Sequence, residues 1–205
     1  MTSRPLFTTL FYQDRVDDGM LLSELEQSCR ALAADDGAGR AWSRAHGYRG
    51  YTSYASLDDL PRRDPTIAAL VRRIDRHVAA FAADSAFDLG GRRLKLDSLW
   101  VNLLHGRGGH SGHLHPHSVV SGTFDVAVPP GAGALKLEDP RLPMMMAAPP
   151  RADDAPEPMR SFVYAEPEPG SLFLWESWLR HEVVPGTGAT NKGAERISIS
   201  FNYRW

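Results

Sequence analysis

The sequence has only one cysteine, Cys29, among its 205 residues. A single thiol can form neither an intrachain disulfide nor a thiolate cluster, so any metal must be held by nitrogen and oxygen ligands. The sequence also lacks a hydrophobic run of the length that a signal peptide or a membrane-spanning helix needs. We therefore expect a cytoplasmic protein that does not insert into a membrane.

An excess of either charge is also missing, because 23 lysines and arginines face 25 acidic residues, a formal net charge of −2. Such a balance gives no electrostatic reason to expect a nucleic-acid or anionic-membrane partner. There is no Gly-x-Ser-x-Gly elbow to suggest a nucleophilic hydrolase. We expect a small-molecule substrate, and a homodimer is left open.

The first part of the chain has the periodicity of helices. Leu21, Leu22, Leu25, Cys29 and Leu32 recur at helical spacing and can form one buried stripe. A second helix is predicted at about 65–83, with Asp64 as its N-cap and Pro65 in its first turn. The aromatic, glycine-rich segment 47–54 between them is predicted to be irregular or extended, and it could line a pocket.

From about residue 92 the pattern changes to short extended runs. These include Leu94 to Leu103 and the ranges 119–128, 134–138, 161–164, 171–175 and 196–203, separated by Gly, Pro and Asp clusters. Many short strands with long connections predict an antiparallel barrel or a double-sheet jelly roll. We expect one domain over 1–205, with helical support over about 1–92 and the barrel over about 93–205. Residues 140–158 are predicted to form a loop over the barrel mouth, long enough to be a lid.

Five of the eight histidines lie between residues 105 and 117. Residues i and i+2 of a strand point to the same side, so His113 and His115 would present two imidazoles together. A metal needs at least one further ligand, and His181, which follows an apolar run, is the remote candidate. The competing interpretation is an ordinary surface loop rich in histidine and glycine.

The last predicted strand alternates strictly. Its apolar face holds Ile197, Ile199, Phe201 and Tyr203, and its polar face holds Arg196, Ser198, Ser200 and Asn202. The polar face could simply meet solvent. Inside a barrel, however, the guanidinium of Arg196 could bind a carboxylate at two points, with the Ser198 hydroxyl beside it.

Seven short motifs occur in a fixed order over about 98–203. They are Trp100-Val101-Asn102, His113-Leu114-His115-Pro116, Ser121-Gly122, Glu138-Asp139-Pro140-Arg141, Gly170-Ser171-Leu172, Ser177-Trp178-Leu179-Arg180-His181 and Arg196-Ile197-Ser198-Ile199-Ser200-Phe201-Asn202. Together they resemble the iron(II)- and 2-oxoglutarate-dependent oxygenase superfamily, specifically a bacterial and phage branch with a His-x-His-Pro motif. The segment 50–53 extends a weaker likeness toward the N-terminus.

This resemblance implies a double-stranded β-helix, the jelly-roll or cupin-like barrel, preceded by helices. It implies Fe(II) on His113, His115 and His181, with 2-oxoglutarate chelating the iron. The far carboxylate of 2-oxoglutarate would meet Arg196 and Ser198, and Asn102 would make a further contact. The implied reaction uses O2, hydroxylates a small-molecule or amino-acid-like substrate, and releases succinate and CO2.

The sequence departs from the superfamily's usual pattern at one ligand. Most members use two histidines and one carboxylate, and the acid normally stands where His115 stands here. Asp125 or Asp139 could instead supply a carboxylate, and Asp125 replaces an aromatic residue of the family. Asp125, His117, His110 and Arg107 are the remaining candidates for contacts to the substrate or to the ligands.

Two other hypotheses stay open at this point. The first is a cupin-like three-histidine metal dioxygenase that does not use 2-oxoglutarate, in which Arg196 and Ser198 would have no required role. The second is a non-enzymatic barrel that binds a small ligand or stores a metal, for which a closed site without open coordination positions would be typical.

Overall fold

The computed structural model of the protein describes residues 3–188 and 194–205. Its longer helices are α1 (Gly19–Asp35), α2 (Gly37–Ala45) and α4 (Pro65–Asp84), with a short α3 (Leu60–Arg63). The strands are β1 (Phe11–Arg15), β2 (Gly50–Thr52), β3 (Lys95–Leu104), β4 (His110–His113), β5 (Val120–Ala127), β6 (Leu135–Glu138), β7 (Phe162–Ala165), β8 (Ser171–Glu176), β9 (His181–Val183) and β10 (Arg196–Arg204). None of the helices in these ranges is both long and apolar enough to cross a membrane.

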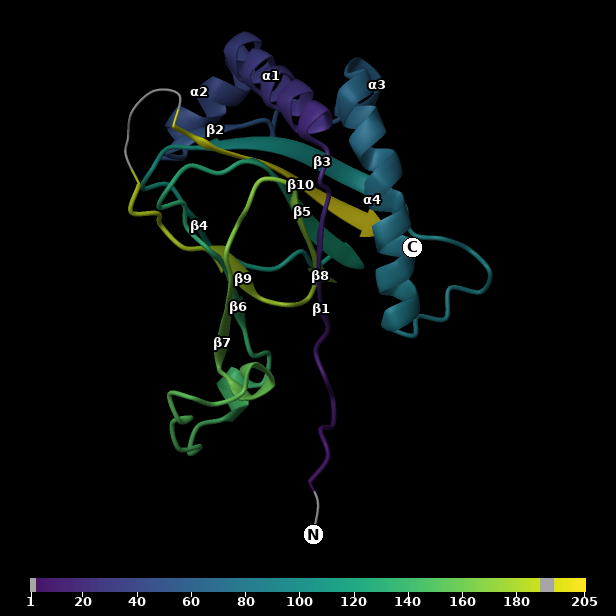
Figure 1. Cartoon of the computed structure of the whole chain (residues 1–205), viewed down its shortest axis with the longest axis vertical. Coiled ribbons are helices and arrows are strands. Elements are labelled where there is room, and N and C mark those ends of the chain that lie inside the picture. The colour runs from purple at the N-terminus through teal and green to yellow at the C-terminus, as the bar shows by residue number, and fades with distance from the viewer. Residues whose placement is uncertain (1–2, 189–193) are drawn as a thin grey trace.

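The strands form two antiparallel sheets. The larger sheet has the order β1-β8-β5-β10-β3-β2, and the smaller has the order β4-β9-β6-β7. Helices α1 and α4 lie against the outer side of the larger sheet (Figure 1). The mainly β architecture expected from the sequence, two sheets of a double-stranded β-helix with flanking helices, is confirmed.

The helix ends follow the predicted capping chemistry. The Asp64 carboxylate accepts hydrogen bonds from the backbone amides of Thr66 and Ile67, and Pro65 occupies the first turn of α4. Asp18 caps α1 in the same way by accepting from the amide of Leu21. The two predicted helices are confirmed, whereas α2 was not predicted, since only nine residues form it and the residues that it buries, Gly39 and Ser43, have small side chains.

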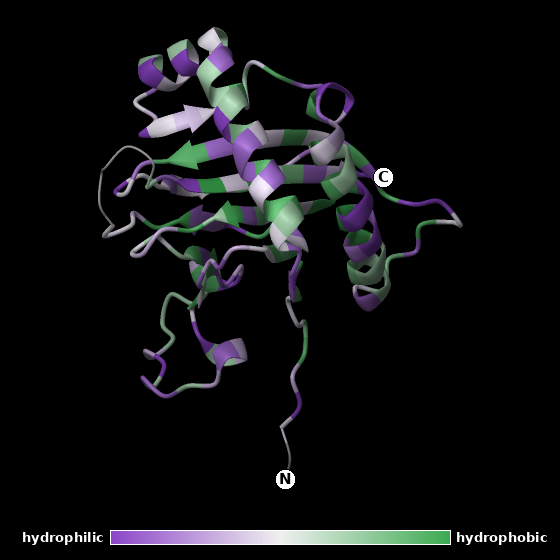
Figure 2. Ribbon diagram, turned by 45° about the horizontal axis from the view of Figure 1, so that its top comes forward, coloured by the Kyte–Doolittle hydropathy of each residue, from purple (hydrophilic) through white to green (hydrophobic). Residues whose placement is uncertain are grey.

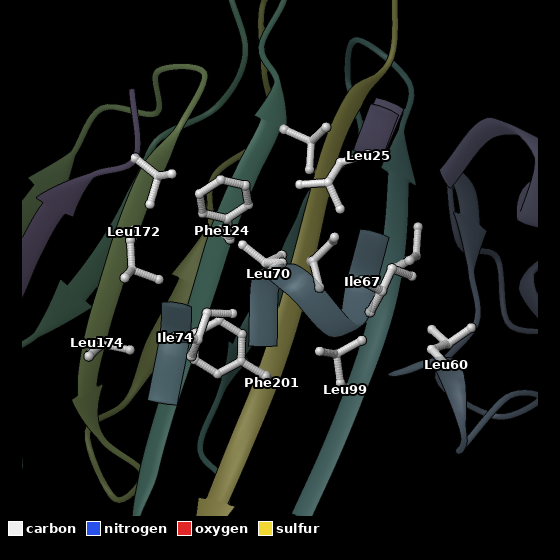
Figure 3. Close-up of a cluster of buried hydrophobic side chains, with 14 of the residues drawn as sticks. Leu25, Leu60, Ile67, Leu70, Ile74, Leu99, Phe124, Leu172, Leu174 and Phe201 are labelled. Carbon is white, nitrogen blue, oxygen red and sulfur yellow. The ribbon is translucent and has the colours of Figure 1, made fainter. Parts of the chain in front are cut away.

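Alternation along the strands divides the interior into two cores. Side chains of the larger sheet that face the helices pack with them in a first core, shown with Leu25, Leu70, Ile74, Leu99, Phe124 and Phe201 in Figure 3. Phe173 and Trp175 of β8 point the other way and fill the space between the sheets with Leu135, Leu137 and Leu179. Figure 2 shows the same alternation of hydrophilic and hydrophobic residues along the strands.

Three features differ from the sequence-based picture. Strands β1 and β2 lie before residue 92 but belong to the larger sheet, at its two edges, so the first part of the chain is not only helical. Residues 140–158 contain one short 3-10 turn, Leu142–Met144, and a second, Glu157–Met159, begins at their end; the segment extends beyond β6 and β7 as a separate lobe (Figure 1). That lobe contributes no residue to the large cavity described below, so it does not cover the cavity in this structure.

Candidate metal centre

A pair of neighbouring strands brings the predicted metal ligands together. In the antiparallel pairing of β4 with β9, His113 lies directly opposite His181, and their ring centroids are 4.4 Å apart. His115 follows two residues after the end of β4, and its ring centroid lies 5.1 Å from that of His113 and 5.2 Å from that of His181. The potential ligand atoms of all three histidines lie within 4.8 Å of one another.

Backbone carbonyls fix the orientation of two of these rings. His113 Nδ1 lies 2.7 Å from the carbonyl oxygen of Ser111, and His181 Nδ1 lies 2.9 Å from that of Leu179. Because a carbonyl oxygen only accepts hydrogen bonds, each Nδ1 must carry the hydrogen, and the lone pair is on Nε2. Metal-bound histidines commonly have this arrangement, with the second ring nitrogen bonded to an outer acceptor.

The third ring has an atom that the protein leaves without a partner. His115 Nδ1 lies 2.7 Å from Asn202 Oδ1, whereas His115 Nε2 is buried and, among the described residues, has no hydrogen-bond partner. A buried nitrogen without a partner costs free energy, so such an atom calls for an explanation. A metal ion bound by the three Nε2 atoms provides one, and the donor set fits iron(II).

Burial keeps these imidazoles in the form that binds metal. Burial lowers the pKa of His181 to about 3, an effect that the Leu179 carbonyl opposes and the nearby histidines reinforce. Burial and His113 also lower the pKa of His115, against the effect of its hydrogen bond to Asn202. Both rings are therefore neutral near pH 7, and the neutral imidazole is the metal ligand.

No carboxylate joins this group in the part of the chain that the structure describes. Asp125 forms an ion pair with Arg196, and Asp139 forms one with Arg141 at 2.9 Å. Neither acid is therefore placed as a substitute for His115. Three imidazoles occupy at most half of an octahedral shell and leave positions for a bidentate ligand and for O2.

Arg196 lies on the inner face of the larger sheet, one of the two placements that the alternation of the last strand left open, but it already has a carboxylate partner. Its Nε donates to Asp125 Oδ1 at 2.8 Å, its Nη2 lies 2.7 Å from the same oxygen, and its Nη1 donates to the Gly133 carbonyl at 2.7 Å. Burial raises the pKa of Asp125, and the charge of Arg196 opposes that rise. Ser198, also buried, lies opposite Asp125 and Asn102 in the neighbouring strands.

Hydrogen bonds through Tyr48 join Asn102, one of the predicted cosubstrate residues, to His110. The Tyr48 hydroxyl donates to Asn102 Oδ1 at 3.2 Å and lies 3.0 Å from His110 Nε2. Burial lowers the pKa of His110 to about 4, and the nearby His113 and Arg196 lower it further. The charge of Arg196 also opposes the rise that burial causes in the pKa of Tyr48. Arg196 thus acts electrostatically on side chains that line the cavity.

His113 and His115 line a cavity of about 1330 Å³, to which the candidates Asn102, Arg107, His110 and His117 also contribute. Among the described residues that line it, His181, Arg196, Ser198 and Asp125 are not found. Aromatic rings run along its wall toward the metal centre. Ring centroids are separated by 6.3 Å between Trp42 and Tyr54, by 5.3 Å between Tyr54 and Trp100, and by 6.0 Å between Trp100 and His115. We refer to Trp42, Tyr54 and Trp100 as the aromatic wall.

Sequence reasoning assigned no role to several residues around the site. Tyr48 lies in the aromatic segment that was expected to line a pocket, so its composition was the available signal. Asn202 was placed on the polar face of the last strand, but nothing in the sequence indicates that it contacts His115. Ser121 and Ser177, which hydrogen-bond next to Asn202, appeared only as members of motifs.

A family model described as "Putative 2OG-Fe(II) oxygenase" matches residues 98–202, just over half of the chain. The chain belongs to this family. It is therefore a non-haem iron oxygenase with iron(II) and 2-oxoglutarate as cofactors, which disfavours both the cupin-like alternative and the non-enzymatic barrel. A search of curated proteins found no match.

Solved structures with the same fold extend over nearly the whole oxygenase. A prolyl-4-hydroxylase from Pseudomonas putida aligns with 97% of this chain and 94% of its own, at 20% identity and a TM-score of 0.59. The epimerase SnoN in complex with Fe3+, α-ketoglutarate and nogalamycin RO covers 96% and 79%, at 16% identity and a TM-score of 0.60. HygX from Streptomyces hygroscopicus, with nickel and 2-oxoglutarate bound, covers 96% and 83%, at 15% identity and a TM-score of 0.59.

Proposed function

We propose that this oxygenase binds iron(II) through the Nε2 atoms of His113, His115 and His181 and hydroxylates a small-molecule or amino-acid-like substrate, releasing succinate and CO2. The observation that carries the proposal is the convergence of three imidazoles whose Nδ1 atoms are all bonded to oxygen acceptors. When bound, iron and 2-oxoglutarate would activate O2, which is the oxidant that an unactivated C–H bond requires. The protein supplies orientation and keeps water from the reacting atoms.

In this proposal the polar inner face of the barrel orients 2-oxoglutarate. Arg196 supplies positive charge for the far carboxylate, and Ser198 supplies a hydroxyl beside it. Asn102, already bonded to Tyr48, lies on the adjacent strand and makes a further contact. Because Asp125 neutralises part of the charge of Arg196, the two N–H groups not directed at Asp125 or Gly133 carry the interaction.

The proposal predicts that succinate formation requires iron(II), 2-oxoglutarate and O2 together. Protein freed of metal with a chelator and reloaded with iron(II) under argon should form succinate only after air is admitted. Reloading with zinc, which has no redox chemistry, should give no succinate above background. Succinate measured by mass spectrometry decides the matter, and equal turnover with and without iron would reject the proposal.

We further propose that the substrate presents a flat ring to the aromatic wall. Tyr54 is 61% exposed although it contacts Trp100, so its ring is available at the edge of the cavity. The wall leads from α2 and the segment after β2 to His115, so a ring stacked on it would bring neighbouring atoms toward the metal centre. Aromatic pairs contribute roughly 0.5–1.5 kcal/mol beyond the burial of area.

Replacing Tyr54 with alanine should therefore weaken the binding of ring-bearing ligands by about two- to tenfold. Saturation-transfer NMR with N-acetyltryptophanamide and N-acetylleucinamide measures the effect, and only the first ligand should lose affinity. Tyr164→Ala is the matched control, because Tyr164 is a similarly exposed tyrosine, 53%, on β7 and outside the cavity. Equal losses for both ligands, or for both variants, would argue against the aromatic wall as a binding surface.

A further inference from the structure

We infer that Asn202 is a positioning residue for the metal centre, joined with Ser121 and Ser177 in a buried hydrogen-bond chain that fixes the His115 ring. The inference rests on the proposed iron site and goes beyond its ligands. It assigns one task to residues from three separate motifs, each of which lies on a different part of the barrel.

The contact between Asn202 and His115 determines which nitrogen of His115 is free. Asn202 Oδ1 lies 2.7 Å from His115 Nδ1, and Asn202 Nδ2 donates to Ser98 Oγ at 3.1 Å. With the amide nitrogen committed to Ser98, the amide oxygen faces the ring and accepts from Nδ1–H. The lone pair of His115 must then be on Nε2, the buried atom that has no partner among the described residues.

Two hydroxyl groups hold the amide oxygen in place. Ser121 Oγ donates to Asn202 Oδ1 at 2.7 Å, and Ser121 Oγ and Ser177 Oγ are also 2.7 Å apart. Since the Ser121 hydrogen is used toward Asn202, the Ser177 hydroxyl must donate to Ser121. The three hydrogen-bonded residues are buried: Asn202 is 7% exposed, Ser121 1% and Ser177 0%. Water therefore does not compete for these hydrogen bonds.

The backbone of Ser177 strengthens the same connection. The amide of His115 donates to the Ser177 carbonyl at 2.9 Å, and the amide of Ser177 donates to the Val119 carbonyl at 3.0 Å. Ser177 lies four residues before His181, in the turn between β8 and β9. The turn that precedes His181 therefore also holds His115. The Ser177 carbonyl contacts His115 directly, and the Ser177 hydroxyl acts on it through Ser121 and Asn202.

The groups that accept hydrogen bonds from the three histidine rings carry no charge. The acceptors for the three Nδ1 atoms are two backbone carbonyls and one amide oxygen, all of them neutral. Many metal-bound histidines donate instead to a carboxylate, which makes the ring a stronger ligand. Asparagine at position 202 therefore fixes the ring without adding negative charge, and a substitution by aspartate would add that charge with little change in shape.

The test uses cobalt(II) as a probe, because its visible absorption reports the geometry and number of its ligands without turnover. Asn202→Leu should weaken cobalt(II) binding to the full-length protein by about 10–100-fold and alter the absorption bands. Asn202→Asp should retain cobalt binding and lower the midpoint potential of the iron-loaded protein, since negative charge stabilises iron(III). Cobalt(II) binding that is retained in Asn202→Asp and weakened in Asn202→Leu is a result that loss of packing alone would not produce.

Ser121→Ala provides the second variant in case Asn202→Leu does not fold, and should weaken cobalt(II) binding by about fivefold. Ser85→Ala is its matched control, because the Ser85 hydroxyl is buried without a hydrogen-bond partner in the described structure and lies at the end of α4. If the cobalt affinity and spectrum of folded Asn202→Leu, or of Ser121→Ala, stay at wild-type values, the inference about Asn202 is overturned while the proposed metal site stands. Failure of the wild-type protein to bind cobalt or iron would instead reject the proposed metal site itself.

Discussion

Protein carrying His181→Ala is expected to retain no iron after gel filtration and to form succinate at least about a thousandfold more slowly than the wild type. Loss of an outer partner alone commonly reduces metal affinity by roughly 10–100-fold, and loss of a ligand should cost more. His181 is buried beside Trp175, with 4.6 Å between the ring centroids. Iron content by mass spectrometry and succinate formation measure the two effects.

A second histidine substitution controls for general effects on the fold. His77 lies on α4, on the other side of the larger sheet, and its ring contacts Tyr12. His77→Ala should keep both iron content and succinate formation within about twofold of the wild type. Full iron retention by His181→Ala would contradict the assignment of His181, whereas a matching loss in His77→Ala would show that the assay reports folding.

Arg196→Ala is expected to lower the free energy of unfolding by about 3–5 kcal/mol, as well as to impair 2-oxoglutarate binding. The stability loss follows from Asp125, which is 0% exposed and would be left as a buried acid without its cationic partner. Urea unfolding monitored by circular dichroism measures this effect. The single substitution therefore cannot by itself separate a cosubstrate contact from the support of the fold.

The double variant Asp125→Leu/Arg196→Met separates the two roles. Replacing a buried ion pair by apolar residues of similar volume is often neutral or stabilising, so most of the lost stability should return. The affinity for 2-oxoglutarate, measured by calorimetry on manganese-loaded protein without O2, should stay at least about thirtyfold below that of the wild type. Wild-type affinity in this variant would show that Arg196 serves only the fold.

Local patterns in the sequence were sufficient for much of the fold. Period-two alternation in β10 identified the four apolar residues that pack under the helices and placed the four polar residues on the opposite face, while leaving open whether that face meets solvent or the interior. Capping by Asp64 with Pro65 identified the start of α4. The two-residue spacing also predicted that the His113 and His115 rings would lie together, and they do, although β4 ends at His113 and regular strand geometry does not extend to His115.

Register and packing decided the rest, because they join residues far apart in the chain. Asp125 and Arg196 are separated by 71 positions, and the pairing of β5 with β10 brings them together. His115 and Asn202 are separated by 87 positions and meet only where the segment after β4 contacts β10. Whether 140–158 covers the cavity likewise depends on the direction in which β6 and β7 project. The sequence by itself thus determined the kinds of side chain available for an iron site. The tertiary structure determined that the potential ligand atoms of the three histidines lie within 4.8 Å of one another and that Asp125 pairs with Arg196, since strand order and burial, which no local pattern encodes, decide both.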